Sequence, residues 1–75
     1  MTTLRPEQLV VCLDNKGNAA SLERRKIYVA LPDPDAEKNG LLRVIDESGE
    51  DYLYPKASFG LITLPDPLKK AVLAA

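Results

Sequence analysis

The hydrophobic positions of this chain fall into short runs separated by turn-forming residues, a pattern typical of a small all-β protein. The first run is nearly continuous and rich in β-prone residues, and a polar stretch over residues 14–25 follows it and predicts a long loop. Runs with the length and composition of strands cover residues 8–13, 26–31, 41–46, 51–54 and 59–64. The pattern therefore predicts five strands connected by loops and tight turns.

The second run shows the clearest alternation. Ile27, Val29 and Leu31 project to one face of a strand, and Tyr28 and Ala30 project to the other. We expect the Ile27 face to be buried, because it carries the larger aliphatic side chains.

Glycine and proline mark the turns. Ser48-Gly49 predicts a hairpin, either with a two-residue primed turn or with a turn closed by a Gly bulge, since Gly supplies a positive φ at low cost. Residues 35–40 predict a single helical turn that ends at Gly40 in the left-handed conformation. Residues 55–58 predict a tight or 3₁₀ turn before the last strand.

The C-terminal segment predicts a short helix. Asp66 can cap it and Pro67 suits its first turn, while Leu68, Val72 and Ala75 share one face. A helix of this length is marginal alone, so we expect it to dock on the sheet, to dock on a partner subunit, or to fray.

These elements indicate a mainly β fold, a small five-stranded SH3-like barrel with a short C-terminal helix. Barrel closure would remove the free edges that five short strands otherwise expose. We expect one domain over residues 1–75, with the barrel at about 9–64 and the helix at about 66–74. An OB-like barrel is the alternative.

Length and composition limit the energetics and the cell compartment. With 75 residues the chain has a small core, and at about 0.05–0.15 kcal/mol per residue its free energy of unfolding should be about 4–11 kcal/mol. Self-association would supplement such a core. The lone Cys12 favours a reducing compartment, and the chain has neither a signal-like apolar segment in residues 1–6 nor a membrane-length one. We expect a cytoplasmic protein with no membrane association.

The residue types argue against most catalytic chemistry. The chain has no His, so Ser and Cys nucleophiles lack their usual base, and a zinc site lacks its ligands. The carboxylates of residues 33–37 resemble the opening of a calcium loop, but Lys38 and Val44 occupy positions where that loop requires Gly and Glu. We therefore expect no enzyme activity, no cofactor and no metal, with a carboxylate and metal enzyme as the remaining catalytic alternative.

Contact chemistry is more abundant than catalytic chemistry. The basic cluster Arg24-Arg25-Lys26 could face the acidic residues 46–51 within the fold, or an acidic partner or phosphate. Tyr52 and Tyr54 share one face of their strand, so they form either an exposed aromatic strip or part of the core, and we favour partial burial with exposed hydroxyl edges. The predicted partner-binding residues are Arg24, Arg25, Lys26, Tyr28, Tyr52, Tyr54 and Lys56.

Two segments resemble known proteins. Residues 25–33 and 39–56 look like a family of short uncharacterised bacterial proteins, and this resemblance implies an SH3-like barrel without an assigned activity. Pro55-Lys56-Ala57-Ser58-Phe59 is similar to the turn before the last strand of eukaryotic SH3 domains. Those domains need a Trp for their proline-peptide groove, and this chain has none.

We expect a non-enzymatic protein–protein interaction module that binds an unidentified protein through the tyrosines and the basic cluster. The alternative is a structural subunit whose surface, including Leu68 and Val72, is covered by self-association. Small barrels also bind nucleic acids, but the net charge of −1 argues against that partner.

Overall fold

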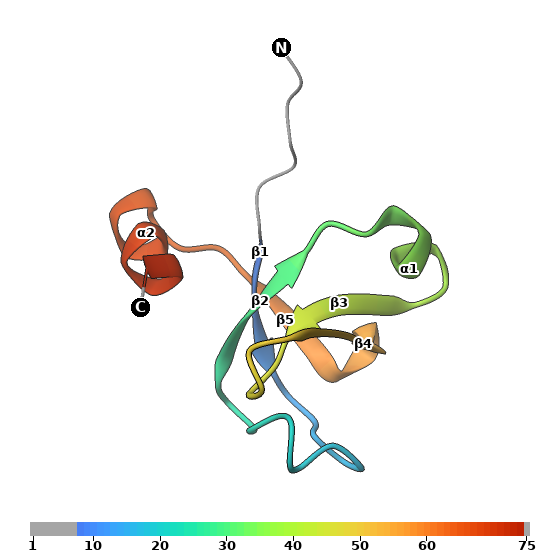
Figure 1. Cartoon of the computed structure of the whole chain (residues 1–75). Helices are drawn as coiled ribbons and strands as arrows, with labels where there is room; N and C mark the ends of the chain where they lie inside the picture. The colour runs from blue at the N-terminus through green and yellow to red at the C-terminus, as the bar shows by residue number, and fades with distance from the viewer. Residues whose placement is uncertain (1–7, 75) are drawn as a thin grey trace.

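The computed structural model describes residues 8–74 (Figure 1). Its elements are β1 (Gln8–Cys12), β2 (Ile27–Leu31), α1 (Pro34–Lys38), β3 (Leu41–Ile45), β4 (Asp51–Pro55), the 3₁₀ helix η1 (Lys56–Ser58), β5 (Phe59–Ile62) and α2 (Asp66–Ala74). The mainly β fold and the short C-terminal helix are thus confirmed, although β5 ends at Ile62 rather than at Leu64. The expectations for residues 1–6 and for Ala75 lie outside the described residues.

The strands form one antiparallel sheet in the order β4-β3-β2-β1-β5. The first four strands form a meander, and β5 returns to pair with β1 so that Cys12 lies opposite Phe59. Within residues 8–74, β4 and β5 share no ladder. The sheet is therefore not closed, and its two edge strands remain unpaired to each other.

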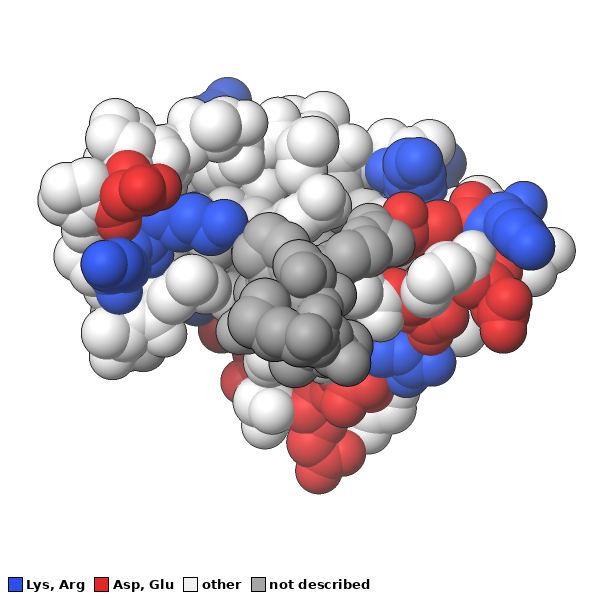
Figure 2. Space-filling view, turned by 90° about the horizontal axis from the view of Figure 1, so that it is seen from above, with Lys and Arg blue, Asp and Glu red and all other residues white. Residues whose placement is uncertain are grey.

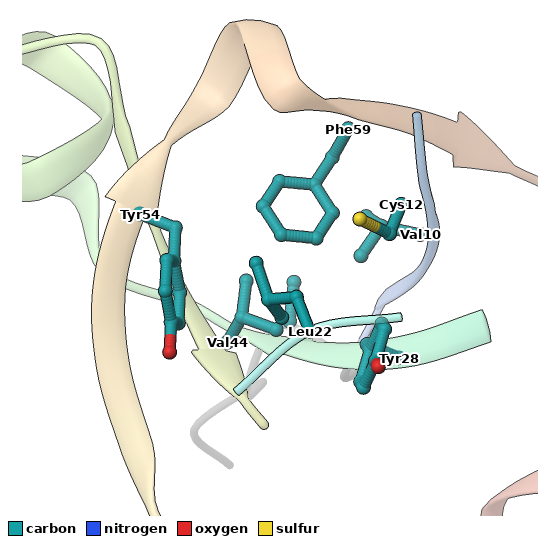
Figure 3. Packing of buried hydrophobic residues seen from close by; sticks show 8 residues of the cluster. Val10, Cys12, Leu22, Tyr28, Val44, Tyr54 and Phe59 are labelled. Carbon is teal, nitrogen blue, oxygen red and sulfur yellow. The ribbon is translucent and has the colours of Figure 1, made fainter. Parts of the chain in front are cut away.

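One face of the sheet holds the core (Figure 3). There the rings of Tyr54 and Phe59 meet edge to face at 6.2 Å between centroids. This contact links β4 to β5, so side chains bridge the seam that the backbone leaves open. The buried cluster consists of Val10, Cys12, Leu22, Tyr28, Ala30, Val44, Tyr54 and Phe59, with Leu42 packed against it.

The expected orientation of β2 is wrong. Tyr28 and Ala30 are buried at 5% and 3% exposure, whereas Ile27 is 39% exposed. The interior can take the Tyr28 ring because its hydroxyl finds polar partners inside the fold and Ala30 leaves room beside it. The larger aliphatic residues of β2 therefore form the outer face of the sheet.

The β3–β4 hairpin uses the second of the two predicted turn types. The Gly49 N–H donates to the Asp46 carbonyl at 3.0 Å, and the Asp46 N–H donates to the Glu50 carbonyl at 3.0 Å. Gly49 has a φ of 84°, which is the conformation of a Gly bulge. Within the turn, the Asp46 carboxylate accepts from the Ser48 N–H and the Ser48 hydroxyl.

Helix α1 closes the loop between β2 and β3. The Asp33 side chain caps it by accepting from the Ala36 N–H at 3.1 Å, and it also accepts from Arg43 Nε at 2.8 Å. Gly40 follows the helix with a φ of 74°, as predicted. Arg43 also pairs with Asp51, so one cation on β3 holds both α1 and β4.

Helix α2 lies against the outer face of the sheet, on the side of the molecule away from α1 (Figure 1). Val72 lines a hollow with Ile27, Val29 and Ile45, yet no residue of α2 is buried. The helix is therefore docked by a narrow contact. Over residues 8–74, no helix has the length and apolar character needed to cross a membrane.

Candidate interaction surface

The three tyrosines occupy two environments. Tyr28 and Tyr54 are 5% and 6% exposed, whereas Tyr52 is 50% exposed. The expected partial burial with exposed hydroxyl edges is therefore wrong for Tyr54, and Tyr28 does not belong to an exposed contact surface, because the small core needs both rings and internal carboxylates satisfy their hydroxyls. Tyr52 is the exposed aromatic ring of the chain, since Phe59 is also buried and there is no Trp.

Tyr28 connects the long loop to the hairpin. Its hydroxyl accepts from the Glu23 N–H at 2.7 Å and donates to Glu47 Oε2 at 2.5 Å. Lys26 Nζ lies 2.7 Å from the same Glu47 oxygen and 5.7 Å from the centroid of the Tyr28 ring. Of the alternatives considered for the basic cluster, pairing with residues 46–51 is thus found for Lys26.

These contacts shift the pKa values of the group. The hydrogen bond from Lys26, and then that from Tyr28, hold the pKa of Glu47 below its usual value. Burial, followed by the hydrogen bond to Glu47, raises the pKa of Tyr28 well above its usual value. At neutral pH Glu47 is therefore a charged acceptor and Tyr28 a neutral donor.

A second tyrosine–carboxylate pair lies at the base of the hairpin. The Tyr54 hydroxyl donates to Asp46 Oδ2 at 2.5 Å, and the other oxygen of Asp46 accepts from the Ser48 hydroxyl at 2.5 Å and the Ser48 N–H at 2.8 Å. Asp46 is only 6% exposed. The Ser48 hydroxyl, and then Tyr54, lower the pKa of Asp46, while burial first and then Asp46 raise the pKa of Tyr54.

The long loop is held by contacts rather than left free. The Glu47 N–H donates to the Ser21 carbonyl at 3.0 Å, and the Asn15 amide donates to the Leu22 carbonyl at 3.0 Å. Leu22 inserts into the core at 1% exposure, between the rings of Tyr28 and Tyr54 in the view of Figure 3. The loop and the hairpin tip therefore form one ordered unit.

A shallow hollow of about 400 Å³ lies between the long loop and the hairpin, and Tyr52 forms one side of it. The Tyr52 hydroxyl donates to Glu50 Oε1 at 3.0 Å, which restrains the exposed ring. The hollow thus combines an aromatic face with hydroxyl, amide and carboxylate groups. Its lining residues are Asn18, Ser21, Asp46, Ser48, Tyr52 and Tyr54.

The remaining predicted contact residues lie at different places. Arg24 and Arg25 are exposed near the end of the long loop, where Arg25 and Lys26 oppose Cys12 in a bulge. Arg25 takes a φ of 68° there, a conformation that favours Gly. Lys56 is exposed at the start of η1, at the end of β4 opposite to the hairpin tip, so the fold does not bring it to the tyrosine–carboxylate cluster.

The surroundings of Cys12 and of the hairpin carboxylates decide their chemistry. Cys12 is fully buried, and burial raises the pKa of its thiol, so the thiolate is disfavoured. Within residues 8–74 no group of three or more His, Cys, Asp or Glu side chains is placed to hold a metal ion. Asp46 and Glu47 act as charged acceptors for neighbouring donors.

Sequence reasoning missed two residues that build this surface, Leu22 and the buried Asp46. Leu22 carried a usable signal, because it is the one large aliphatic residue in the polar stretch 14–25. Asp46 carried a weaker signal, since a core built from tyrosines needs carboxylate or backbone acceptors nearby.

Comparison of the chain with protein families, with curated proteins and with solved structures gives no match.

Proposed function

We propose that this protein is a non-enzymatic protein–protein interaction module whose contact surface is the hollow beside Tyr52. The observation that carries the proposal is the exposure of this one aromatic ring, held by Glu50 above a polar hollow, while the other three rings are buried. Tyrosine offers a large and rigid contact area with a polar tip, which is why it is enriched at interfaces.

The chemistry of the hollow favours a partner segment that carries Lys or Arg. A cation placed over the Tyr52 ring would meet its electron-rich face and would also lie near the carboxylates of Glu50 and Asp46. The hollow is preorganised, because hydrogen bonds already hold the hairpin tip and the loop in place. Binding would therefore cost little conformational entropy on this side of the interface.

The same proposal includes an SH3-like architecture with an open seam. The strand order, the long loop between β1 and β2 and the 3₁₀ helix before β5 support it, as does the single cluster of inward side chains. The resemblance to short bacterial proteins of this architecture fits the same proposal. We also propose a cytoplasmic location, because Cys12 is a free thiol and is the single cysteine of the sequence. Arg24 and Arg25, exposed on the loop that lines the hollow, are proposed as secondary contacts.

Selection from a displayed library of random peptides tests the contact surface. We expect the wild-type chain to enrich peptides with Lys or Arg, and we expect Tyr52→Ala to lose about 10-fold or more in affinity for them. Tyr52→Phe should retain most of the affinity, because the ring is kept.

Leu53→Ala is the matched control. Leu53 is the next residue on the same strand, is 43% exposed, and projects to the opposite face of the sheet. The proposal fails if the selected peptides bind Tyr52→Ala as tightly as the wild type, or if Leu53→Ala weakens binding as much as Tyr52→Ala does.

A further inference from the structure

Asn39 and Gly40 form the one Asn-Gly pair of the sequence, and both lie exposed at the end of α1 (Figure 1). In such a pair the nitrogen of the glycine can attack the amide carbon of the preceding side chain, because glycine has no Cβ to hinder the approach. The other two asparagines precede Lys16 and Ala19, whose side chains hinder the same attack. Asn39 should therefore react first wherever the backbone around it is free to rotate.

The reaction needs no enzyme and no co-reactant other than water. The Gly40 nitrogen loses its proton to solvent and bonds to Cγ of Asn39, and the side-chain nitrogen takes up a proton and leaves as ammonia. Water then adds to one of the two carbonyls of the resulting five-membered imide and breaks the bond from that carbonyl to nitrogen. The product at position 39 is an aspartate or an isoaspartate, in which the main chain runs through the former side chain.

The folded structure holds the two reacting groups apart. The N–H groups of Asn39 and Gly40 donate to the carbonyls of Ala36 and Glu37 at 2.9 and 3.1 Å. The Asn39 side chain donates through Nδ2 to the Asp35 carbonyl at 2.9 Å. At the Asn39 ψ of 14° the Gly40 nitrogen nearly eclipses the nitrogen of Asn39 itself, so it lies away from the side chain. The attack therefore requires the end of α1 to open and Asn39 to rotate.

We propose that Asn39 is a site of spontaneous deamidation, that the closed end of α1 protects it, and that the product restores this end poorly. An aspartate at this position lacks the Nδ2 donor for the Asp35 carbonyl and places a negative charge four residues after Asp35. Acidic side chains already gather at the end of the molecule that carries α1 (right in Figure 2). Each reacted chain should thus have a looser helix than the chain it came from.

The isoaspartate product should disturb the neighbouring turn as well. The Gly40 carbonyl accepts from the Lys56 N–H at 2.8 Å, which ties the end of α1 to the start of η1. An isoaspartate lengthens the main chain by one carbon just before this carbonyl and displaces it. Asn39 lies at the end of β3 opposite to the hairpin tip, so this site is separate from the hollow beside Tyr52.

The test is the rate of deamidation of each asparagine in the full wild-type chain at mildly alkaline pH. Trypsin releases residues 39–43 as one peptide and leaves Asn15 and Asn18 on two others. Mass spectrometry follows the gain of about 1 Da in each peptide. We expect Asn39 to react about 10-fold or more faster in concentrated urea than in the folded chain, because the folded chain must first open locally.

Both parts of the proposal can fail in this experiment. Equal rates at Asn39 in the folded and the unfolded chain overturn the protection by α1. A rate at Asn39 in urea that is no higher than the rates at Asn15 and Asn18 overturns the choice of site.

Variants of α1 test whether its closure sets the rate. Asp33→Ala removes the cap of the helix and its ion pair with Arg43, so deamidation of the folded chain should accelerate about 3-fold or more. Asp35→Ala is the matched control, because it removes the same charge from the same helix and leaves the Asp33 cap in place. Equal rates in Asp33→Ala and the wild type would contradict the proposal.

Asn39→Asp reproduces one of the two products and tests the loosened helix. Hydrogen exchange at the amides of residue 39 and Gly40, which close the end of α1, should become about 3-fold or more faster. Asn18→Asp makes the same chemical change in the long loop and should leave these two amides unaffected. Unchanged exchange in Asn39→Asp would show that the product restores the helix end.

Discussion

Tyr54 and Asp46 form a buried hydrogen bond of 2.5 Å between the far end of β4 and the base of the turn that precedes this strand. Both residues are 6% exposed. The same carboxylate accepts from Ser48, so one aspartate ties the turn to the core. The polar site and the hydrophobic core of this protein are therefore one structure, and a change in either should alter the other.

Removing the hydroxyl of Tyr54 tests this coupling. Tyr54→Phe keeps the ring but deprives the buried Asp46 of a donor, so we expect the free energy of unfolding to fall by about 1–3 kcal/mol. Urea unfolding followed by circular dichroism measures the change. Tyr52→Phe is the control, because its hydroxyl bonds to Glu50 at the exposed surface and its removal should have little effect. Equal unfolding midpoints for Tyr54→Phe and the wild type would show that the Asp46 contact does not stabilise the fold.

Acid should destabilise the protein through its paired carboxylates. The pKa values of Asp46 and Glu47 lie below their ordinary values of 3.8 and 4.5, chiefly because Ser48 and Lys26 donate to them. The unfolded chain therefore binds protons at higher pH than the folded chain. The stabilisation is fully present above the ordinary values and is lost as the pH falls from about 5 through the lowered pKa values.

The urea concentration at the midpoint of unfolding, measured at several pH values between neutral and about 3, reports this loss of stability. Glu47→Gln removes one of the titrating groups while keeping an acceptor for Tyr28, so its midpoint should depend less steeply on pH. An unchanged pH dependence in Glu47→Gln would contradict the role of that carboxylate.

Alkaline pH should unfold the protein as its buried tyrosines ionise. Burial is the main cause that raises the pKa of both Tyr28 and Tyr54 above the ordinary value of 10.0. Their neutral forms stabilise the folded state below that value, and the stabilisation is lost as the pH rises through the raised pKa values. In Tyr52→Phe only these two tyrosines remain, so tyrosinate absorbance and loss of the β-sheet signal should rise together. Tyrosinate formation while the sheet is intact would contradict their burial.

The left-handed backbone at Arg25 predicts a stabilising substitution. Its φ of 68° costs a residue with a side chain about 1–2 kcal/mol, and Gly avoids this cost. Arg24→Gly is the matched control, because it removes the same charge and adds the same flexibility without a positive φ at that position. We expect Arg25→Gly to be more stable than Arg24→Gly by about 1 kcal/mol in thermal unfolding. Equal stabilities would argue against strain at this bulge.

The stability and order of the long loop should depend on the side chain of Leu22. Leu22 is 1% exposed in the core, so Leu22→Ala should cost about 2–5 kcal/mol through lost burial and the cavity that remains. Leu61→Ala, at a position that is 66% exposed, should cost less than about 0.5 kcal/mol. Hydrogen exchange of the loop amides would also accelerate in Leu22→Ala. Equal effects of both substitutions on stability and loop exchange would contradict this role of Leu22.

Local chemistry determined most of the elements of this fold. Alternation and β-propensity located the strands, and Gly40 and Gly49 marked the end of a helix and a turn, because a positive φ is decided by local residues. Asp66 and Pro67 marked the start of α2. The absence of His and the single Cys likewise limited the catalytic chemistry from the composition alone.

Only the tertiary structure decided which face of each strand is the core. The alternation of β2 presents two faces that are both apolar enough to be buried, and the choice of Tyr28 over Ile27 depends on Glu47, which lies 19 residues away along the chain. The same holds for Tyr54, whose burial needs Asp46, and for Leu22, whose place in the core depends on the strands around it. Burial of a polar ring depends on distant acceptors, and a strand pattern carries no information about those partners.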